Sequence, residues 1–115
     1  MKIGILTSGG DCSGLNAVIR AAGISLFNNL KGGLIRGEGE LLGRDDLNGI
    51  LDKGGTILGS SRQPFKQMEV VGDDGESKLA KMVRNYKAMG LDCLITIGGA
   101  GTHKNAALLK REGCK

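Results

Sequence analysis

The chain contains few aromatic residues, one histidine, one proline and an odd number of cysteines. Its 115 residues include two phenylalanines, one tyrosine and no tryptophan. Proteins that bind single-stranded nucleic acid stack bases on aromatic side chains, and no basic run here could follow a phosphate backbone, so we expect no nucleic-acid partner. One histidine and three widely separated cysteines lack the ligand spacing of a zinc site. Unpaired thiols instead fit a reducing compartment such as the cytoplasm.

Long hydrophobic runs are also missing. The apolar stretch near the N-terminus is too short for a signal peptide, and no segment could cross a bilayer. We therefore expect a cytoplasmic protein without a membrane partner. The length suits one domain with a core of its own. The net charge of +4 is compatible either with an ordinary solvated surface or with an anionic ligand.

Glycine is the residue present in excess. It accounts for 21 of the 115 residues, whereas about 7% is typical of soluble proteins. The glycines show no fixed period, which excludes a collagen-like chain, and several occur as pairs, at positions 9–10, 32–33, 54–55 and 98–99. Glycine pairs beside apolar runs predict tight turns in which the backbone can approach a ligand closely.

Hydrophobic periodicity divides the chain into alternating strands and helices. The pattern predicts strands over residues 2–7, 34–36, 56–58 and 92–97, and helices over residues 15–28, 45–51, 76–89 and 102–111. Such alternation is typical of an α/β fold with a Rossmann-like parallel sheet flanked by helices. Ligands of these sheets bind beyond the carboxyl ends of the strands, and glycine pairs follow the two strongest predicted strands there.

The sequences TSGGDCSG and GGAGTHK form the two turns at this edge. Backbone N–H groups at a helix N-terminus can bind a phosphate, and glycines let the phosphate come close. The first turn is neither a Walker P-loop nor a G-x-G-x-x-G motif, so a tight turn without a ligand is an equal alternative.

Single residues near these turns each allow two interpretations. Thr102 either caps the last helix or donates to a phosphate. His103 is either a surface residue or a general base, and Asp11 either caps the first helix or lies near metal and phosphate. Arg62, after a predicted strand end and a glycine, either recognises phosphate with its guanidinium or is merely solvated.

Three segments in order, ILTSGGDCSGLNAVIR, KGGTILGSSR and LITIGGAGTHKNAALL, closely resemble the N-terminal third of a 6-phosphofructokinase. The resemblance covers nearly the whole chain except about residues 29–45. It is nearest to the bacterial branch that contains pyrophosphate-dependent and mixed-type members. It implies a glycolytic kinase that transfers a phosphoryl group from ATP or pyrophosphate, with Mg²⁺, to the 1-hydroxyl of fructose 6-phosphate.

The resemblance also implies a domain organisation. Residues 1–115 would be an incomplete N-terminal part of the phosphofructokinase large domain, that is, a partial nucleotide- or phosphate-binding domain. The sugar-phosphate domain would be absent. Members of the family usually form homo-oligomers, although the interface segments mostly fall outside this sequence.

The resemblance assigns roles to individual positions. Arg62 would be the catalytic residue that bridges the donor phosphates during transfer. Binding of the phosphoryl donor would involve Gly10, Arg62, Gln63, Gly99, Ala100, Gly101 and Thr102. Ala100 occupies the metal position, where the family commonly has an aspartate or asparagine, and a methyl group cannot ligate Mg²⁺. Pyrophosphate-dependent members often carry an aspartate at the position of Gly101, so glycine favours ATP.

Further departures concern activity and regulation. The family's T-I-D-N-D segment, which holds its aspartate base, does not occur in this sequence. We therefore expect these 115 residues to be inactive alone. Residues 29–45 are shorter than the family's second strand and following loop, which puts that strand in question. Arg20 matches an arginine of the allosteric site, but Ile24 replaces the second arginine, so no effector control is predicted.

Three hypotheses remain open. The chain is the N-terminal portion of a 6-phosphofructokinase, a non-catalytic ATP- or phosphate-binding module such as a degenerate gene product, or a structural piece that folds only with the rest of the enzyme.

Overall fold

The computed structural model describes residues 1–9, 14–22, 26–28, 33–43, 45–59 and 62–115. The strands are β1 (Ile3–Thr7), β2 (Leu26–Asn28), β3 (Glu40–Leu42) and β4 (Cys93–Ile97). The helices are α1 (Leu15–Ala22), α2 (Gly33–Arg36), α3 (Lys78–Ala88) and α4 (Ala100–Arg111). Two 3₁₀ turns, η1 (Asp45–Leu47) and η2 (Phe65–Gln67), complete the described elements.

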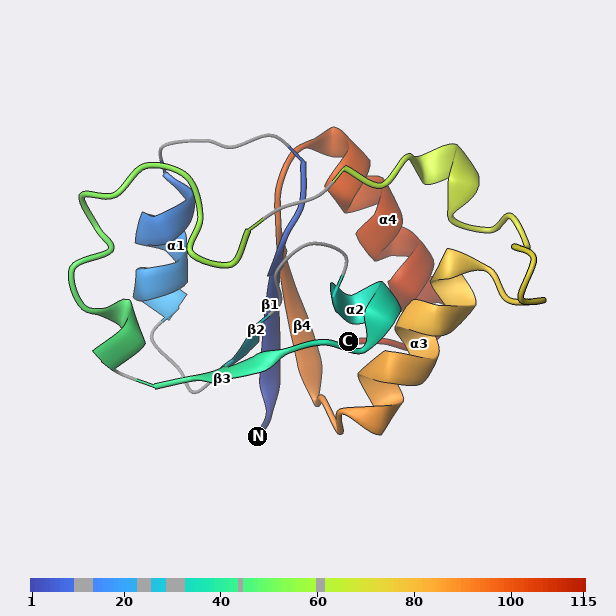
Figure 1. Ribbon diagram of the computed structural model, residues 1–115, viewed down its shortest axis with the longest axis horizontal. Coiled ribbons are helices and arrows are strands. Elements are labelled where there is room, and N and C mark those ends of the chain that lie inside the picture. The colour runs from blue at the N-terminus through green and yellow to red at the C-terminus, as the bar shows by residue number, and fades with distance from the viewer. Residues whose placement is uncertain (10–13, 23–25, 29–32, 44, 60–61) are drawn as a thin grey trace.

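The four strands form one sheet in the order β3-β2-β1-β4. β1 lies between two parallel neighbours, β2 and β4, and β3 runs antiparallel to β2 at the edge. Figure 1 shows β1 and β4 side by side in the middle of the molecule. The predicted α/β fold with a parallel sheet is therefore confirmed, with one antiparallel edge strand that the sequence did not indicate.

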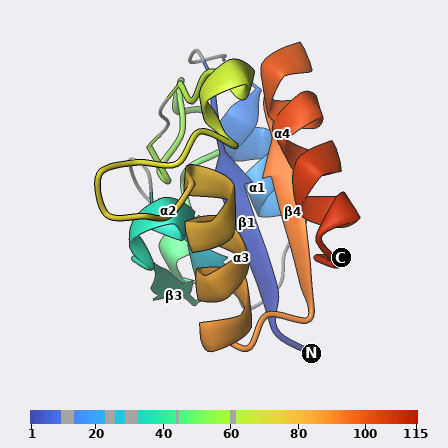
Figure 2. The same ribbon diagram turned by 90° about the vertical axis from the view of Figure 1, so that its right-hand side faces the viewer.

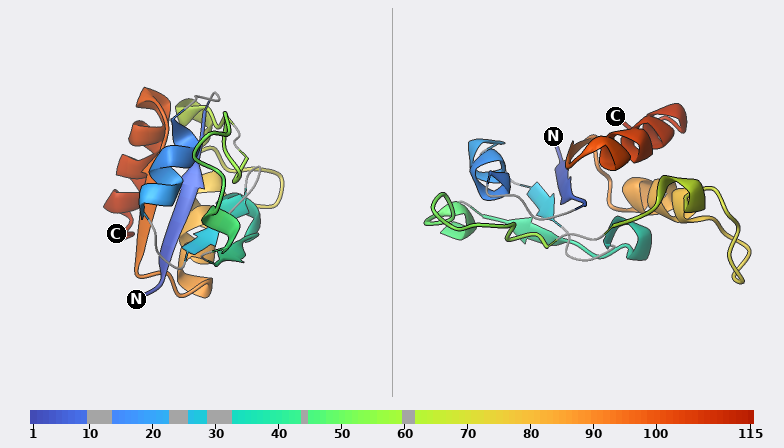
Figure 3. Two further views of the ribbon diagram at one scale, coloured as in Figure 1. Left: turned by 90° about the vertical axis from the view of Figure 1, so that its left-hand side faces the viewer. Right: turned by 90° about the horizontal axis from the view of Figure 1, so that it is seen from above.

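Alternation along β1 and β4 creates two cores, one on each face of the sheet. Ile3 and Ile5 of β1 face α1 and the segment around η1, together with Ile95 of β4. Leu6 and Leu94 face the opposite side, which is covered by α2, α3 and α4. Seen from the side, α3 and α4 lie over one face of the strands and α1 lies behind them (Figure 2). The view from above in Figure 3 shows the same separation.

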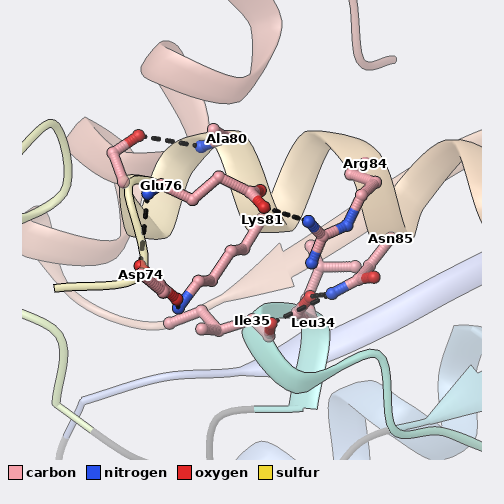
Figure 4. A network of polar contacts seen from close by, with 9 residues as sticks. Leu34, Ile35, Asp74, Glu76, Ala80, Lys81, Arg84 and Asn85 are labelled. Carbon is pink, nitrogen blue, oxygen red and sulfur yellow. Dashed lines mark hydrogen bonds and ion pairs between the residues drawn. The ribbon is translucent and has the colours of Figure 1, made fainter. Parts of the chain in front are cut away.

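α3 has the clearest sequence signals and follows them. Ser77 caps its N-terminus by accepting a hydrogen bond from the Ala80 N–H at 3.1 Å, and Gly90 follows its end with φ of +65°, a backbone conformation that favours glycine. Figure 4 shows ion pairs of Lys81 with Asp74 and of Arg84 with Glu76 along the helix. These contacts join the preceding loop to the first turns of α3.

The weakly patterned region between α1 and η1 departs from prediction. The helix predicted over residues 15–28 ends at Ala22, and β2 occupies its last three positions, paired in parallel with β1. The sheet therefore has a second strand at residues 26–28, which precede the shortened segment 29–45. β2 and β3 have three residues each, so neither is long enough to show an alternating pattern, and pairing with neighbouring strands decides their structure.

Two short strands predicted from apolar runs are wrong. Residues 34–36 form part of the helix α2, and the Asn85 side chain donates to the Leu34 and Ile35 carbonyls at 2.8 and 3.0 Å (Figure 4). Residues 56–58 form a turn, in which the Ile57 N–H donates to the Asn16 side chain rather than to a neighbouring strand. The helix predicted over residues 45–51 is only the 3₁₀ turn η1.

None of the described helices is long and apolar enough to cross a membrane.

Cys93 and Cys114 are free thiols, and burial raises the pKa of the Cys114 thiol.

Candidate functional site

The carboxyl ends of β1 and β4 meet at one edge of the sheet. Thr7 pairs with Ile97 at the end of the parallel register, and the Ser8 N–H donates to the Ile97 carbonyl at 3.0 Å. Gly9 lies in the first predicted turn and has a φ of +98°. A Cβ added at Gly9 would lie 3.9 Å from the Thr102 Oγ1 atom. The two turns therefore start next to each other. Gly10 and Asp11 lie outside the described residues.

Gly98 is the tightest point of the second turn. A Cβ added there would lie 2.3 Å from Thr102 Oγ1 and 2.4 Å from the Ser8 carbonyl oxygen. Heavy atoms do not approach this closely without a bond, and the Ser8 oxygen belongs to the backbone and cannot rotate away. Only glycine therefore lets the chain leave β4 so close to the end of β1.

Thr102 connects the two turns. The helix α4 starts at Ala100, two residues earlier than predicted, so Thr102 lies within its first turn rather than at the cap. Its buried hydroxyl donates to the Ser8 carbonyl at 3.2 Å. Because the hydroxyl proton is used in this bond to β1, the Thr102 hydroxyl does not donate to a phosphate in this arrangement. The backbone N–H of Thr102 is the group that can bind an anion.

The N-terminus of α4 is open to a ligand. Gly99 is its N-cap residue, and among the described residues no side chain caps the terminus, so these residues leave the N–H groups of the first turn for an external acceptor. Ala100 and Gly101 are exposed, and a Cβ added at Gly101 would meet nothing within 4 Å. The first turn contains no acidic residue that would repel an anion.

The described residues do not fit a Mg²⁺ site at this position. The Ala100 side chain is a methyl group, and Mg²⁺ requires oxygen ligands. Throughout the part of the chain that the structure describes, no three His, Cys, Asp or Glu side chains are grouped in a way that could hold a metal ion. Any Mg²⁺ at this edge would depend on other ligands, including phosphate oxygens.

Gln63 anchors the segment that carries Arg62. The Asn105 Nδ2 donates to the Gln63 carbonyl at 3.0 Å, which ties the segment to the second turn of α4. The Lys78 Nζ donates to the Gln63 Oε1 at 3.0 Å, which ties it to the start of α3. Arg62 itself is exposed. The structure therefore brings Arg62 and Gln63 to α4, on the same side of the sheet edge as residues 99–102.

Asn105 is a site residue that the sequence did not single out. It is buried in α4, and its Oδ1 is the one buried side-chain oxygen without a hydrogen-bond partner among the described residues. Its carboxamide borders a cavity of about 60 Å³ between the sheet and the helices α2, α3 and α4. Its position in the motif GGAGTHKN, six residues after Gly99, gave no sign of this, because a helical asparagine is ordinarily a surface residue.

Two lysines lie on segments that meet near the first turns of α4. Lys104 lies with its Nζ 6.0 Å from the centre of the Phe65 ring, so η2 and α4 are neighbours. His103 and Lys66 are exposed nearby in sequence, on α4 and η2. Together with the helix dipole, the charges of Lys104 and Lys66 favour an anionic ligand at this edge.

Comparisons with known proteins agree with this arrangement. Residues 2–115 match the Phosphofructokinase family. The ATP-dependent 6-phosphofructokinase of Spirochaeta thermophila is 47% identical, over 96% of this chain and 34% of the relative. The ATP-dependent 6-phosphofructokinase 3 of Bacteroides thetaiotaomicron is 45% identical, over 98% of this chain and 36% of the relative.

Solved structures give the same result for the fold. The crystal structure of Pichia pastoris phosphofructokinase in the T-state matches with a TM-score of 0.81 and 31% identity, over 96% of this chain and 13% of that one. Phosphofructokinase from Saccharomyces cerevisiae matches with a TM-score of 0.78 and 32% identity, over 96% and 15% of the two chains. The chain spans about a third of the length of the curated relatives that it matches. By sequence and by fold, it belongs to the phosphofructokinase family.

Proposed function

We propose that this chain forms the phosphoryl-donor part of a 6-phosphofructokinase. The complete enzyme would transfer the γ-phosphoryl group of ATP to the 1-hydroxyl of fructose 6-phosphate. The observation that carries the proposal is the meeting of three features at one sheet edge: the close turn at Gly98, the uncapped N-terminus of α4, and the segment bearing Arg62, which Asn105 ties to α4.

Each feature suits one part of the donor. The N–H groups of residues 99–102 would bind phosphate oxygens, since a helix N-terminus carries partial positive charge. Arg62 would donate to the β- and γ-phosphates of bound ATP and neutralise the charge that develops between them during transfer. Because phosphoryl transfer is catalysed mainly by positioning and charge stabilisation, these backbone and guanidinium groups are the contribution expected of this chain.

The reaction itself breaks one bond and forms one bond. The oxygen of the sugar 1-hydroxyl attacks the γ-phosphorus, the bond from that phosphorus to the bridging oxygen breaks, and ADP leaves. The hydroxyl proton passes to a base, and we assign none of the described residues to that role. Phosphofructokinases in general use Mg²⁺ with ATP, but Ala100 supplies no ligand, so we assign no step in this chain to the metal.

ATP is the preferred donor in this proposal, with pyrophosphate as the alternative. Space around Gly101 would accommodate the α-phosphate of ATP, and the relatives described above are named ATP-dependent. The loss of a carboxylate at Ala100 favours a second candidate function, a non-catalytic ATP- or phosphate-binding module. For either function we place the protein in the cytoplasm, without a nucleic-acid or membrane partner, and in a homo-oligomer when complete.

Two measurements test the proposal. Calorimetric titration of the chain with ATP, in the presence of Mg²⁺, should show binding, and pyrophosphate should bind more weakly. A titration that is silent at millimolar ATP would count against a donor site. A coupled assay with fructose 6-phosphate separates the two candidate functions when this chain replaces the matching third of the Spirochaeta thermophila relative. Turnover by that chimera above background supports the kinase, and ATP binding without turnover supports the module.

A further inference from the structure

We propose that Asn16, on α1, is a positioning residue for the phosphoryl-donor site. Its carboxamide, together with the Thr7 hydroxyl, fixes the backbone that carries Arg62. This inference rests on the proposed function, because it assumes that Arg62 contacts the donor phosphates.

Asn16 clamps one short segment of backbone from both sides. Its side chain is 1% exposed. The Nδ2 donates to the Lys53 carbonyl at 3.0 Å, and the Oδ1 accepts from the Ile57 N–H at 2.8 Å. The partners lie 37 and 41 residues further along the chain, so these are tertiary bonds rather than local helix contacts. A buried amide with both ends paired to one segment holds that segment in a single position.

Thr7 holds the next part of the same segment. Its hydroxyl donates to the Gly59 carbonyl at 2.5 Å. Since a hydroxyl has one proton, the contact of 3.1 Å between the Thr7 and Thr56 Oγ1 atoms must be donated by Thr56. Thr56 Oγ1 in turn accepts from the Leu58 N–H at 3.1 Å. The donors and acceptors thus form one consistent chain from the turn at residues 56–59 to the last residue of β1.

Arg62 is restrained because the chain on both sides of it is hydrogen-bonded. Gly59 is fixed by Thr7, and Gln63 is fixed by Asn105. Three peptide units separate Gly59 from Arg62, which limits the distance between their Cα atoms to about 11 Å. Arg62 is therefore held between two anchors, one on β1 and one on α4, although its own side chain is exposed.

A double-mutant cycle in ATP binding tests the inference. The variants are Asn16→Ala, Arg62→Ala and the double variant, each titrated with ATP in the presence of Mg²⁺. Removing Arg62 should weaken binding about tenfold, as expected for one charge-assisted hydrogen bond. Asn16→Ala should weaken binding about fivefold when Arg62 is present and by less than about twofold when it is absent, because the two residues act through the same contact.

Thr7 and Asn48 supply controls. Thr7→Val removes the hydroxyl at nearly constant shape and should reproduce the effect of Asn16→Ala, whereas Thr7→Ser retains the hydroxyl and should retain binding. Asn48→Ala makes the same chemical change as Asn16→Ala at an exposed position and should bind ATP like the wild type. Circular dichroism at the titration temperature shows whether each variant is folded, and if Asn16→Ala is unfolded, the Thr7 pair decides.

The contrary outcomes are distinguishable. If Arg62→Ala weakens binding while Asn16→Ala and Thr7→Val bind like the wild type, or weaken binding equally with and without Arg62, the positioning role is overturned and the proposed function stands. If the wild type does not bind ATP, or Arg62→Ala binds equally well, the proposed donor site fails, and the positioning role fails with it.

Discussion

The two walls of the candidate site differ in what holds them in place. The wall at the start of α4 consists of backbone, fixed by the parallel register of β1 and β4 and by the close turn at Gly98. The wall that carries Arg62 is fixed by the side chains of Thr7, Asn16 and Asn105. The first wall should therefore tolerate most side-chain changes, whereas the second can be loosened by truncating one side chain.

Gly98→Ala should have the largest effect, because it disrupts the backbone wall itself. The added methyl would lie 2.4 Å from the Ser8 carbonyl oxygen, so β1 and α4 must move apart. We expect the free energy of unfolding to fall by about 3 kcal/mol, the upper range for overpacking, and ATP binding to be lost. Chemical denaturation and titration measure the two effects.

The matched control for this change is the adjacent residue. A Cβ added at Gly99 would meet nothing within 4 Å. Gly99→Ala should change the stability by less than about 1 kcal/mol, the range of N-cap substitutions. Equal destabilisation by the two substitutions would show that the close approach at Gly98 does not hold this wall.

Ala100→Asp should have the next largest effect, on the metal dependence of binding. In the wild type, chelation of Mg²⁺ should change the affinity for ATP only slightly, because the chain offers no ligand at this position. A carboxylate there should strengthen Mg²⁺-dependent ATP binding about tenfold, a gain of about 1.4 kcal/mol. Ala107→Asp, an exposed position further along α4, is the control and should leave the metal dependence unchanged. An unaltered response in Ala100→Asp would mean that position 100 does not face the metal.

Gly101→Ala should raise the stability of the protein while weakening its binding of ATP. Alanine is preferred to glycine in helices, and the position has space, so the free energy of unfolding should rise by about 0.5 kcal/mol. The methyl should weaken ATP binding a few fold and affect pyrophosphate less. Thermal melts and paired titrations with the two donors test this. Equal losses for both donors would contradict the assigned position of the α-phosphate.

The smallest effect concerns the loop before α3, away from both walls. The hydrogen bond from Lys81, and then that from the Glu76 N–H, lower the pKa of Asp74 below its ordinary value. A lowered folded-state pKa means that the contribution to stability is present above about pH 4 and is lost as the pH falls through the folded-state pKa. Asp74→Asn should therefore lower the thermal midpoint slightly at pH 7 and leave it nearly unchanged near pH 2. A difference that persists near pH 2 would assign the effect to something other than the charge.

How far the sequence determines the structure differs between regions. β1, α3, β4 and α4 were predicted with small errors at their ends, because each has a sustained apolar pattern and recognisable end signals such as Ser77 and Gly90. β2, α2 and β3 were not predicted, because they are short and depend on partners that are distant in sequence. The Asn85 side chain, about 50 residues away, donates to the Leu34 and Ile35 carbonyls of α2.

The site shows the same division. The meeting of the two turns followed from the rule that ligands bind at the carboxyl ends of parallel strands, and the resemblance named the residues on them. The supports of the Arg62 wall could not be predicted, because Asn16 and Asn105 lie in helices and act through tertiary hydrogen bonds to backbone groups. Neither hydrophobic periodicity nor residue spacing predicts such tertiary hydrogen bonds. The roles of Arg62, Gln63 and residues 99–102 stay predictions until a ligand is observed.

Amide hydrogen exchange with and without ATP tests the central claim most directly, since it reports where the donor binds. The account predicts that ATP slows exchange at the N–H groups of residues 99–102, and that Arg62→Ala reduces this protection in proportion to the loss of affinity. Protection elsewhere in the chain, with residues 99–102 unchanged at saturating ATP, would contradict the placement of the phosphates at the start of α4.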